Sequence, residues 1–135
     1  MDEFGAYFRI ATTSNRNGNS NNVFVLNRRL RVVGSLTEIA KGETIKSARF
    51  LEKKLYLVTF RQVDPFFVIG FKNQRQPFIL GELKITGFSS YLHPYDDETI
   101  IGIGRQADEN GRTKGLKISI FDVSDVRNPT ESAKF

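Results

Sequence analysis

The sequence has no cysteine and only one histidine among its 135 residues. Without cysteine there is no disulfide framework, thiol nucleophile or thiolate metal site. No apolar run approaches the roughly 20 residues that cross a bilayer as a helix, and residues 1–8 have neither the basic start nor the long apolar middle of a signal peptide. We therefore expect no membrane span and no leader segment in this chain.

Long runs of one charge are also missing. Twenty basic and 15 acidic residues give a net charge of +5 and an isoelectric point near 9.6, but no basic run exceeds two residues. The excess of basic residues favours acidic partners, and the interspersion weakens that signal. The twelve phenylalanines lie mostly within or beside apolar segments, which indicates core packing rather than base stacking. Nucleic acid is therefore not an expected partner.

What the sequence does contain is a strand pattern. Short segments rich in Val, Ile, Phe, Tyr and Thr alternate with turn residues, and no long apolar stripe of helical period appears. The best helical window, residues 37–48, is interrupted by Gly42. The pattern predicts an all-β fold.

The strands repeat along the chain. The segment "LYLVTFRQ" at 55–62 matches "TIIGIGRQ" at 99–106, 44 positions later (99 − 55), and "YFRIATTS" at 7–14 has the same form. A second strand, a polar turn and a third strand follow each one. Two of these turns end in a proline, Pro77 and Pro129, and the third strands "VVGSL" and "ILGEL" align Gly34 with Gly81. A strand precedes the middle strand in only two units, at 45–50 and 89–94.

Repeats of four strands in about 40 to 50 residues are typical of β-propeller blades. We therefore predict one partial β-propeller domain over residues 1–135. It consists of three consecutive four-stranded antiparallel blades, near 6–42, 43–86 and 87–135, the first incomplete because it lacks its opening strand. Each proline is expected just before an outermost strand, where the missing N–H is tolerated.

The residues of several segments resemble those of a known protein family. The stretches "FRIATT", "NNVFVL", "YLVTFRQVDPFFVI", "GELKITGFSSYLHPYDDETIIGIG" and "GLKISIFDVSDVRNP" cover most of the chain. They resemble the secreted, C-terminal β-propeller domain family of bacteria and archaea; the turn "GFKNQRQ" and Val126 depart from its pattern. The resemblance implies an extracellular or cell-envelope location and brings no catalytic residue to carry over.

Three blades are too few for a closed propeller, which has four to eight. The chain should therefore expose a strand edge and two apolar blade faces. We expect either self-association or coverage by the remaining blades of a longer parent chain.

The candidate ligand-binding residues are Arg61, Gln62, Arg105 and Gln106. In an antiparallel blade, loops between the second and third strands share an end with the connections between blades, and here these loops are long and polar. Two guanidinium groups at equivalent positions would suit an anionic ligand. The alternative is that each arginine caps its strand or packs between blades.

Other chemical signals are weak. His93, beside Asp96, Asp97 and Glu98, has no second histidine or cysteine to complete a metal site. Residues 108–111 lack the spacing of a calcium loop, and Asp122 and Asp125 belong to a repeated turn. We therefore expect no catalysis, cofactor or metal. The function that we predict is a non-catalytic scaffold or binding module for a protein or polyanionic ligand.

Two alternatives stay open. One is a fragment of a propeller enzyme whose active site needs further blades. The other is a binder of acidic polymers through the basic loop end that carries Arg61 and Arg105.

Overall fold

A computed structural model describes residues 2–16, 18–60, 64–85, 87–108, 110 and 112–135, with the side chains of residues 64 and 65 excepted. Within these ranges, no helix is long and apolar enough to cross a membrane. The strands are β1 (Asp2–Phe4), β2 (Tyr7–Ser14), β3 (Ser20–Leu26), β4 (Val32–Ile39), β5 (Thr44–Leu51), β6 (Lys54–Phe60), β7 (Asp64–Gly70), β8 (Phe78–Ile85), β9 (Phe88–Asp96), β10 (Thr99–Ala107), β11 (Thr113–Asp122) and β12 (Thr130–Lys134).

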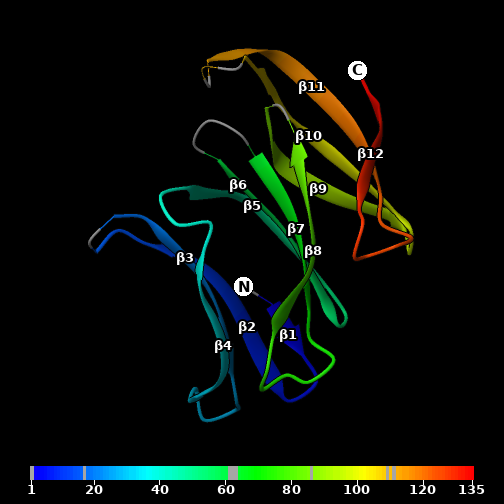
Figure 1. Cartoon of the computed structure of the whole chain (residues 1–135). Helices are drawn as coiled ribbons and strands as arrows, with labels where there is room; N and C mark the ends of the chain where they lie inside the picture. The colour runs from blue at the N-terminus through cyan, green and yellow to red at the C-terminus, as the bar shows by residue number, and fades with distance from the viewer. Residues whose placement is uncertain (1, 17, 61–63, 86, 109, 111) are drawn as a thin grey trace.

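These strands form three antiparallel sheets of four strands each, in the orders β1-β2-β3-β4, β5-β6-β7-β8 and β9-β10-β11-β12. We call them the first, second and third sheets. They stack face to face in chain order (Figure 1). The prediction of an all-β partial β-propeller with three consecutive antiparallel blades is confirmed.

The expectation that the first blade lacks its opening strand is wrong. Residues Asp2–Phe4 form β1, which pairs with β2 through Asp2 and Arg9, so the blade begins well before residue 6. Three residues are too few to show the alternation by which a strand is recognised in a sequence.

The register of the repeat also differs from the sequence match. Leu51 pairs with Lys54 across one hairpin and Asp96 with Thr99 across the next, so Lys54 corresponds to Thr99, an offset of 45 (99 − 54) rather than 44. A slip of one residue exchanges the two faces of a strand. The sequence match was shifted by one residue from the true register, because β6 is apolar on both faces and has no alternation of apolar and polar residues to fix the register.

The core has two layers, one at each junction between sheets. Between the first and second sheets, Val23 and Val25 pack in one cluster with Leu55, Leu57 and Ile69. Between the second and third, Tyr56, Val58, Phe66 and Val68 meet Leu92, Ile100 and Phe121. The rings of Phe66 and Phe121 stack with their centroids 4.5 Å apart. The second sheet is thus buried on both faces, and each such side chain contributes about 1.5–3 kcal/mol by leaving water.

A buried arginine, Arg9, joins the first and second sheets. Arg9 is only 1% exposed, and its Nε donates to Asp2 Oδ2 at 3.0 Å while another guanidinium nitrogen donates to the Glu52 carbonyl. The rings of Phe4, Phe50 and Phe71 lie 4.8–5.2 Å from the guanidinium carbon. A buried charge is tolerated only with such partners. Arg9 therefore holds both β1 and the β5–β6 turn in place.

Close contacts at glycine set how the sheets stack. A Cβ atom at Gly34 in β4 would lie 2.4 Å from the Gln74 carbonyl oxygen, and one at Gly81 in β8 would lie 2.3 Å from the Val126 carbonyl oxygen. The turns before the outermost strands of the second and third sheets therefore each lie on the outermost strand of the preceding sheet. Pro77 and Pro129 end these turns just before β8 and β12, which confirms their predicted place.

Candidate functional site

The two ends of the sheets differ. The β2–β3 loop and the β4–β5 connection share one end, where the Gly42 amide donates to the Asn19 carbonyl and Asn21 Nδ2 donates to the carbonyls of Ile39 and Glu43. We call this end, where β6 also ends and β7 begins and which carries the β10–β11 connection, the loop end. The opposite end, which we call the turn end, carries the turns that join the first strand to the second and the third to the fourth in each sheet. This arrangement confirms that loops between second and third strands share an end with the sheet-to-sheet connections. The expectation that these loops are the longer ones is wrong, because the longest connections, residues 71–77 and 123–129, lie at the opposite end.

The structure describes two of the four predicted ligand-binding residues, Arg105 and Gln106, and both lie toward the loop end of β10. Arg61 and Gln62 fall outside the described residues. Arg105 is exposed near the end of β10, opposite Leu116, and Gln106 is half-buried. The offset of 45 aligns Arg105 with Phe60, so equivalence of the two arginines does not follow from the repeat. A paired guanidinium site here stays a prediction.

The weaker signals have structural partners. His93 is exposed on β9, and its ring stacks on Tyr91 with centroids 6.4 Å apart. Asp108 Oδ1 accepts the backbone amides of Asn110 and Arg112 at 2.9 Å, which closes the turn; Glu109 and Gly111 lie outside the described residues. Across the ranges that the structure describes, no group of three or more His, Asp or Glu side chains is placed to hold a metal ion.

The turn end repeats a motif that the sequence analysis did not single out. Asn27 Oδ1 accepts the Arg29 amide at 2.9 Å, Asn73 Oδ1 accepts that of Arg75 at 3.0 Å, and Asp125 Oδ1 accepts that of Arg127 at 3.1 Å. In each turn a side-chain oxygen fixes the backbone and an exposed arginine follows two positions later. Each sheet therefore presents an arginine on a hydrogen-bonded turn.

Arginines converge at the junction of the first and second sheets. A hollow of about 350 Å³, the arginine pocket, is lined by Arg28, Arg29 and Arg31 from the β3–β4 turn, by Arg75 from the β7–β8 turn, and by Ala6, Tyr7 and Asn27. Among the residues that the structure describes, no carboxylate lines it. Arg75 reaches it from the second sheet because the Arg75 backbone rests on Gly34 of the first.

A second cationic hollow lies at the next junction. It measures about 370 Å³ and we call it the lysine pocket. In the described part of the chain its cations are Lys53, Lys54, Lys72 and Arg127, and the other lining residues are Gly70, Phe78 and Leu80, with no carboxylate among them. The contact of the Arg127 backbone with Gly81 repeats the arrangement at Gly34.

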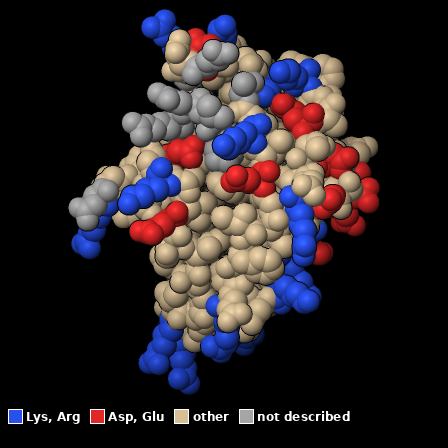
Figure 2. Space-filling view, viewed as in Figure 1, with Lys and Arg blue, Asp and Glu red and all other residues tan. Residues whose placement is uncertain are grey.

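These eight cations are only partly neutralised: Lys53 and Lys54 also line a neighbouring hollow together with Glu52 and Asp97. None of them forms an ion pair with another residue that the structure describes. Hydrogen bonds from Asn128 and from the Arg127 amide lower the pKa of Asp125, and the Arg127 charge lowers it slightly further. The Arg127 charge is therefore partly balanced by this carboxylate. Figure 2 shows Lys and Arg side chains at the lower end, over the turns of the first two sheets, and Asp and Glu gathered beside the turns of the third. The turns of the first two sheets therefore attract anions.

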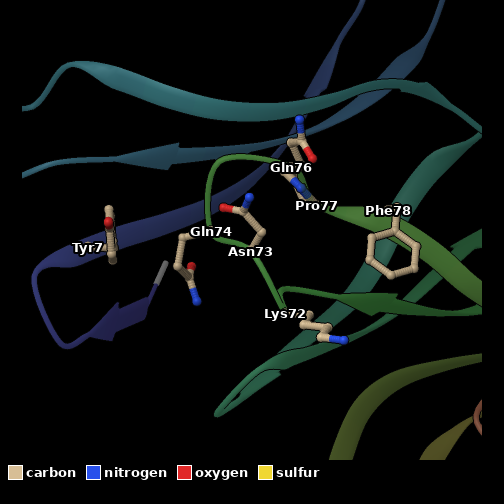
Figure 3. Close-up of a pocket in the computed structure, with 7 residues that line it drawn as sticks. All are labelled: Tyr7, Lys72, Asn73, Gln74, Gln76, Pro77 and Phe78. Carbon is tan, nitrogen blue, oxygen red and sulfur yellow. The ribbon is translucent and has the colours of Figure 1, made fainter.

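A hollow of about 790 Å³, the amide pocket, lies between the two cationic pockets. It shares Tyr7 with the arginine pocket and Lys72 and Phe78 with the lysine pocket, and Asn73, Gln74, Gln76 and Pro77 complete its lining (Figure 3). Gln74 Nε2 donates weakly to the Phe71 carbonyl at 3.4 Å, while Gln74 Oε1 is buried without a hydrogen-bond partner in the described structure. An unpaired buried acceptor costs about 1–3 kcal/mol.

Sequence reasoning missed this surface because its cations come from four separate segments. They lie at 28–31, 53–54, 72–75 and 127, so no basic run marks them. The recurring signal was an Asn or Asp followed two positions later by Arg, within a polar turn between two strands. That pattern shows which arginines share one end of the sheets once the strand order is known.

Comparison with known proteins gives relatives without an assigned activity. A family model described as a beta propeller domain matches residues 1–135. An uncharacterized protein of Methanocaldococcus jannaschii is 46% identical over 139 residues, which cover 100% of this chain and 22% of that protein. An uncharacterized protein of Archaeoglobus fulgidus is 43% identical over 135 residues, covering 100% of this chain and 20% of that protein. The chain thus spans about a fifth of these relatives. No solved structure matches it.

Proposed function

Because this chain belongs to the beta propeller domain family, we propose that it is a non-catalytic binding scaffold whose turn end binds a polyanionic ligand. The arginine pocket is the observation that carries the proposal: four arginines from two sheets line one hollow without a carboxylate. The resemblance to secreted propellers supports a position outside the cell. Binding residues on turns held by a rigid stack of sheets fit this role.

Guanidinium groups suit this task. Each is planar and permanently charged, and it can donate two parallel hydrogen bonds to a carboxylate, sulfate or phosphate. Arg28, Arg29, Arg31 and Arg75 are all exposed, so their donors are available to a ligand. Because the Asn27 and Asn73 side chains already fix the two turns, little backbone order has to be gained on binding.

The partners of the scaffold include whatever covers the outer face of the third sheet. On that face Ile101 lies opposite Ile120 and Ile103 opposite Ile118. In the second sheet the corresponding side chains are Tyr56 with Val68 and Val58 with Phe66, which are buried against the third sheet. Ile103 is 38% exposed. This open face supports either self-association or further blades of a longer chain.

Salt-gradient elution from a heparin column tests anion binding at the turn end. A turn-end variant, Arg29→Gln with Arg75→Gln, is compared with a loop-end variant, Arg105→Gln with Arg112→Gln, which loses the same formal charge. We expect the turn-end variant to elute at clearly lower salt than the loop-end variant. Equal elution of the two variants, or earlier elution of the loop-end variant, would overturn the proposal, and the second result would favour the loop end.

A further inference from the structure

The three hollows of the turn end form one continuous surface. Tyr7 belongs to both the arginine and the amide pockets, and Lys72 and Phe78 belong to both the amide and the lysine pockets. The surface therefore runs from the first sheet toward the third. A small anion would fill only one of these hollows, whereas a linear polymer can occupy all three.

The middle of this surface has a different chemistry from its two ends. Asn73, Gln74 and Gln76 line it, and amide groups both donate and accept hydrogen bonds, as hydroxyl groups do. Lys72 is the one cation among the described residues that line it. The centre of the surface therefore suits an uncharged ligand segment that is rich in hydroxyl groups.

An aromatic ring borders this central hollow. Phe78 is 45% exposed, and Figure 3 shows it on the opposite side of the hollow from Tyr7, with the Gln74 side chain on the Tyr7 side. Exposed rings beside amide groups can pack against the apolar face of a sugar ring while the amides bind its hydroxyls. The buried Gln74 oxygen has no hydrogen-bond donor among the described residues, so one acceptor beside this hollow is unsatisfied.

Resting on the proposed function, we propose that the polyanionic ligand is an acidic polysaccharide. Its carboxylate or sulfate groups bind in the arginine and lysine pockets, and an uncharged sugar ring between them lies in the amide pocket. Single-stranded nucleic acid fits less well, because it carries a phosphate at every nucleotide and is bound by successive aromatic rings. Here one exposed Phe and three amides separate the two groups of cations.

The test uses two probes, hyaluronan, in which charged and uncharged sugars alternate, and polyphosphate, which has no sugar. The amide variant is Gln74→Leu with Gln76→Leu. Gln76→Leu alone is tested as well, because Gln76 is exposed and its replacement does not disturb the fold as replacement of the half-buried Gln74 could. The control is Asn15→Leu with Asn110→Leu at the loop end. None of these variants changes the net charge, so polyphosphate affinity should stay the same.

We expect the amide variants to bind hyaluronan about tenfold more weakly and the control to bind like the unmodified protein. Unchanged hyaluronan affinity in the amide variants, with polyphosphate still bound through Arg29 and Arg75, would overturn the polysaccharide assignment and leave anion binding intact. Tighter binding of single-stranded DNA than of hyaluronan would overturn it in favour of nucleic acid. Failure to bind either probe or DNA would remove the proposed function as well.

Discussion

The backbone of Arg75 rests directly on Gly34 of the neighbouring sheet. A Cβ atom at position 34 would lie 2.9 Å from the Arg75 Cα atom, which is closer than real side chains approach a backbone. This one contact joins the first two sheets and also brings Arg75 beside the three arginines of the β3–β4 turn. Stability and ligand binding are therefore linked at Gly34.

Gly34→Ala should lower the free energy of unfolding by about 1–3 kcal/mol, because the added methyl group forces the backbones of two sheets apart. Urea unfolding followed by circular dichroism measures the change. Gly115→Ala is the matched control, since a Cβ atom at Gly115 meets nothing within 4 Å. Similar unfolding midpoints for the two variants would show that the sheets accommodate a methyl group at position 34 without loss of stability.

Asp2→Ala should destabilise the protein by about 1–3 kcal/mol, because it removes the carboxylate partner of the buried Arg9 guanidinium. Glu3→Ala provides the comparison on the same strand, where the side chain is exposed. Thermal unfolding distinguishes the two. If Glu3→Ala costs as much as Asp2→Ala, the effect comes from fraying of β1 rather than from the ion pair.

Glu43→Gln should stabilise the protein at pH 7, by less than about 1 kcal/mol. Burial, and to a lesser extent repulsion by Glu82, raises the pKa of Glu43 above its ordinary value, against a hydrogen bond from Thr59 that lowers it. A carboxyl with a raised pKa binds a proton more tightly in the folded state. Stability is therefore lost as the pH rises from the ordinary value of 4.5 through the folded-state pKa.

The gain from Glu43→Gln should vanish near pH 4, where both the folded and unfolded carboxyl groups are largely protonated. Urea unfolding at pH 4 and pH 7 checks this dependence, with Glu98→Gln at an exposed position as the reference. A gain of the same size at both pH values would contradict the electrostatic explanation and would indicate better packing of the amide.

The chain should associate through the outer face of the third sheet, and Ile103→Lys with Ile118→Lys should abolish that association. Two charges on an apolar face make its burial costly. Sedimentation across a dilution series gives the mass, and Thr37→Lys with Thr113→Lys controls for added charge at exposed positions. A monomer of 15.4 kDa for the unmodified chain at all concentrations would contradict self-association.

The sequence allowed the strand succession to be predicted because propeller blades repeat both their apolar segments and their turns. Pro77 and Pro129 marked the outermost strands correctly, and the aligned Gly34 and Gly81 mark the two close contacts between sheets. The three-residue β1 left too little pattern to be recognised. The register of the strands could not be predicted either, because the pattern of a strand that is apolar on both faces, such as β6, hardly changes after a shift of one residue.

The candidate site was harder to predict than the fold, for a physical reason. Charge clusters on a propeller are made by turns that are about 50 residues apart in sequence, so that Arg29 and Arg75 meet only after the sheets have stacked. The polar loops at the opposite end carried a stronger local signal in the sequence and favoured Arg61 and Arg105. Polarity can be recognised within one segment, whereas convergence of charge required the strand order.

The contacts at Gly34 and Gly81 also give the stack of sheets a direction. Gly34 and Gly81 each receive the turn of the sheet that follows, and the register of β11 with β12 places Ala133 at the corresponding position of the third sheet. A further sheet docked in the same way would meet a methyl group there and would have to sit slightly farther away. Units joined end to end would therefore be unevenly spaced, and a designed tandem array would need Ala133→Gly before its period became regular.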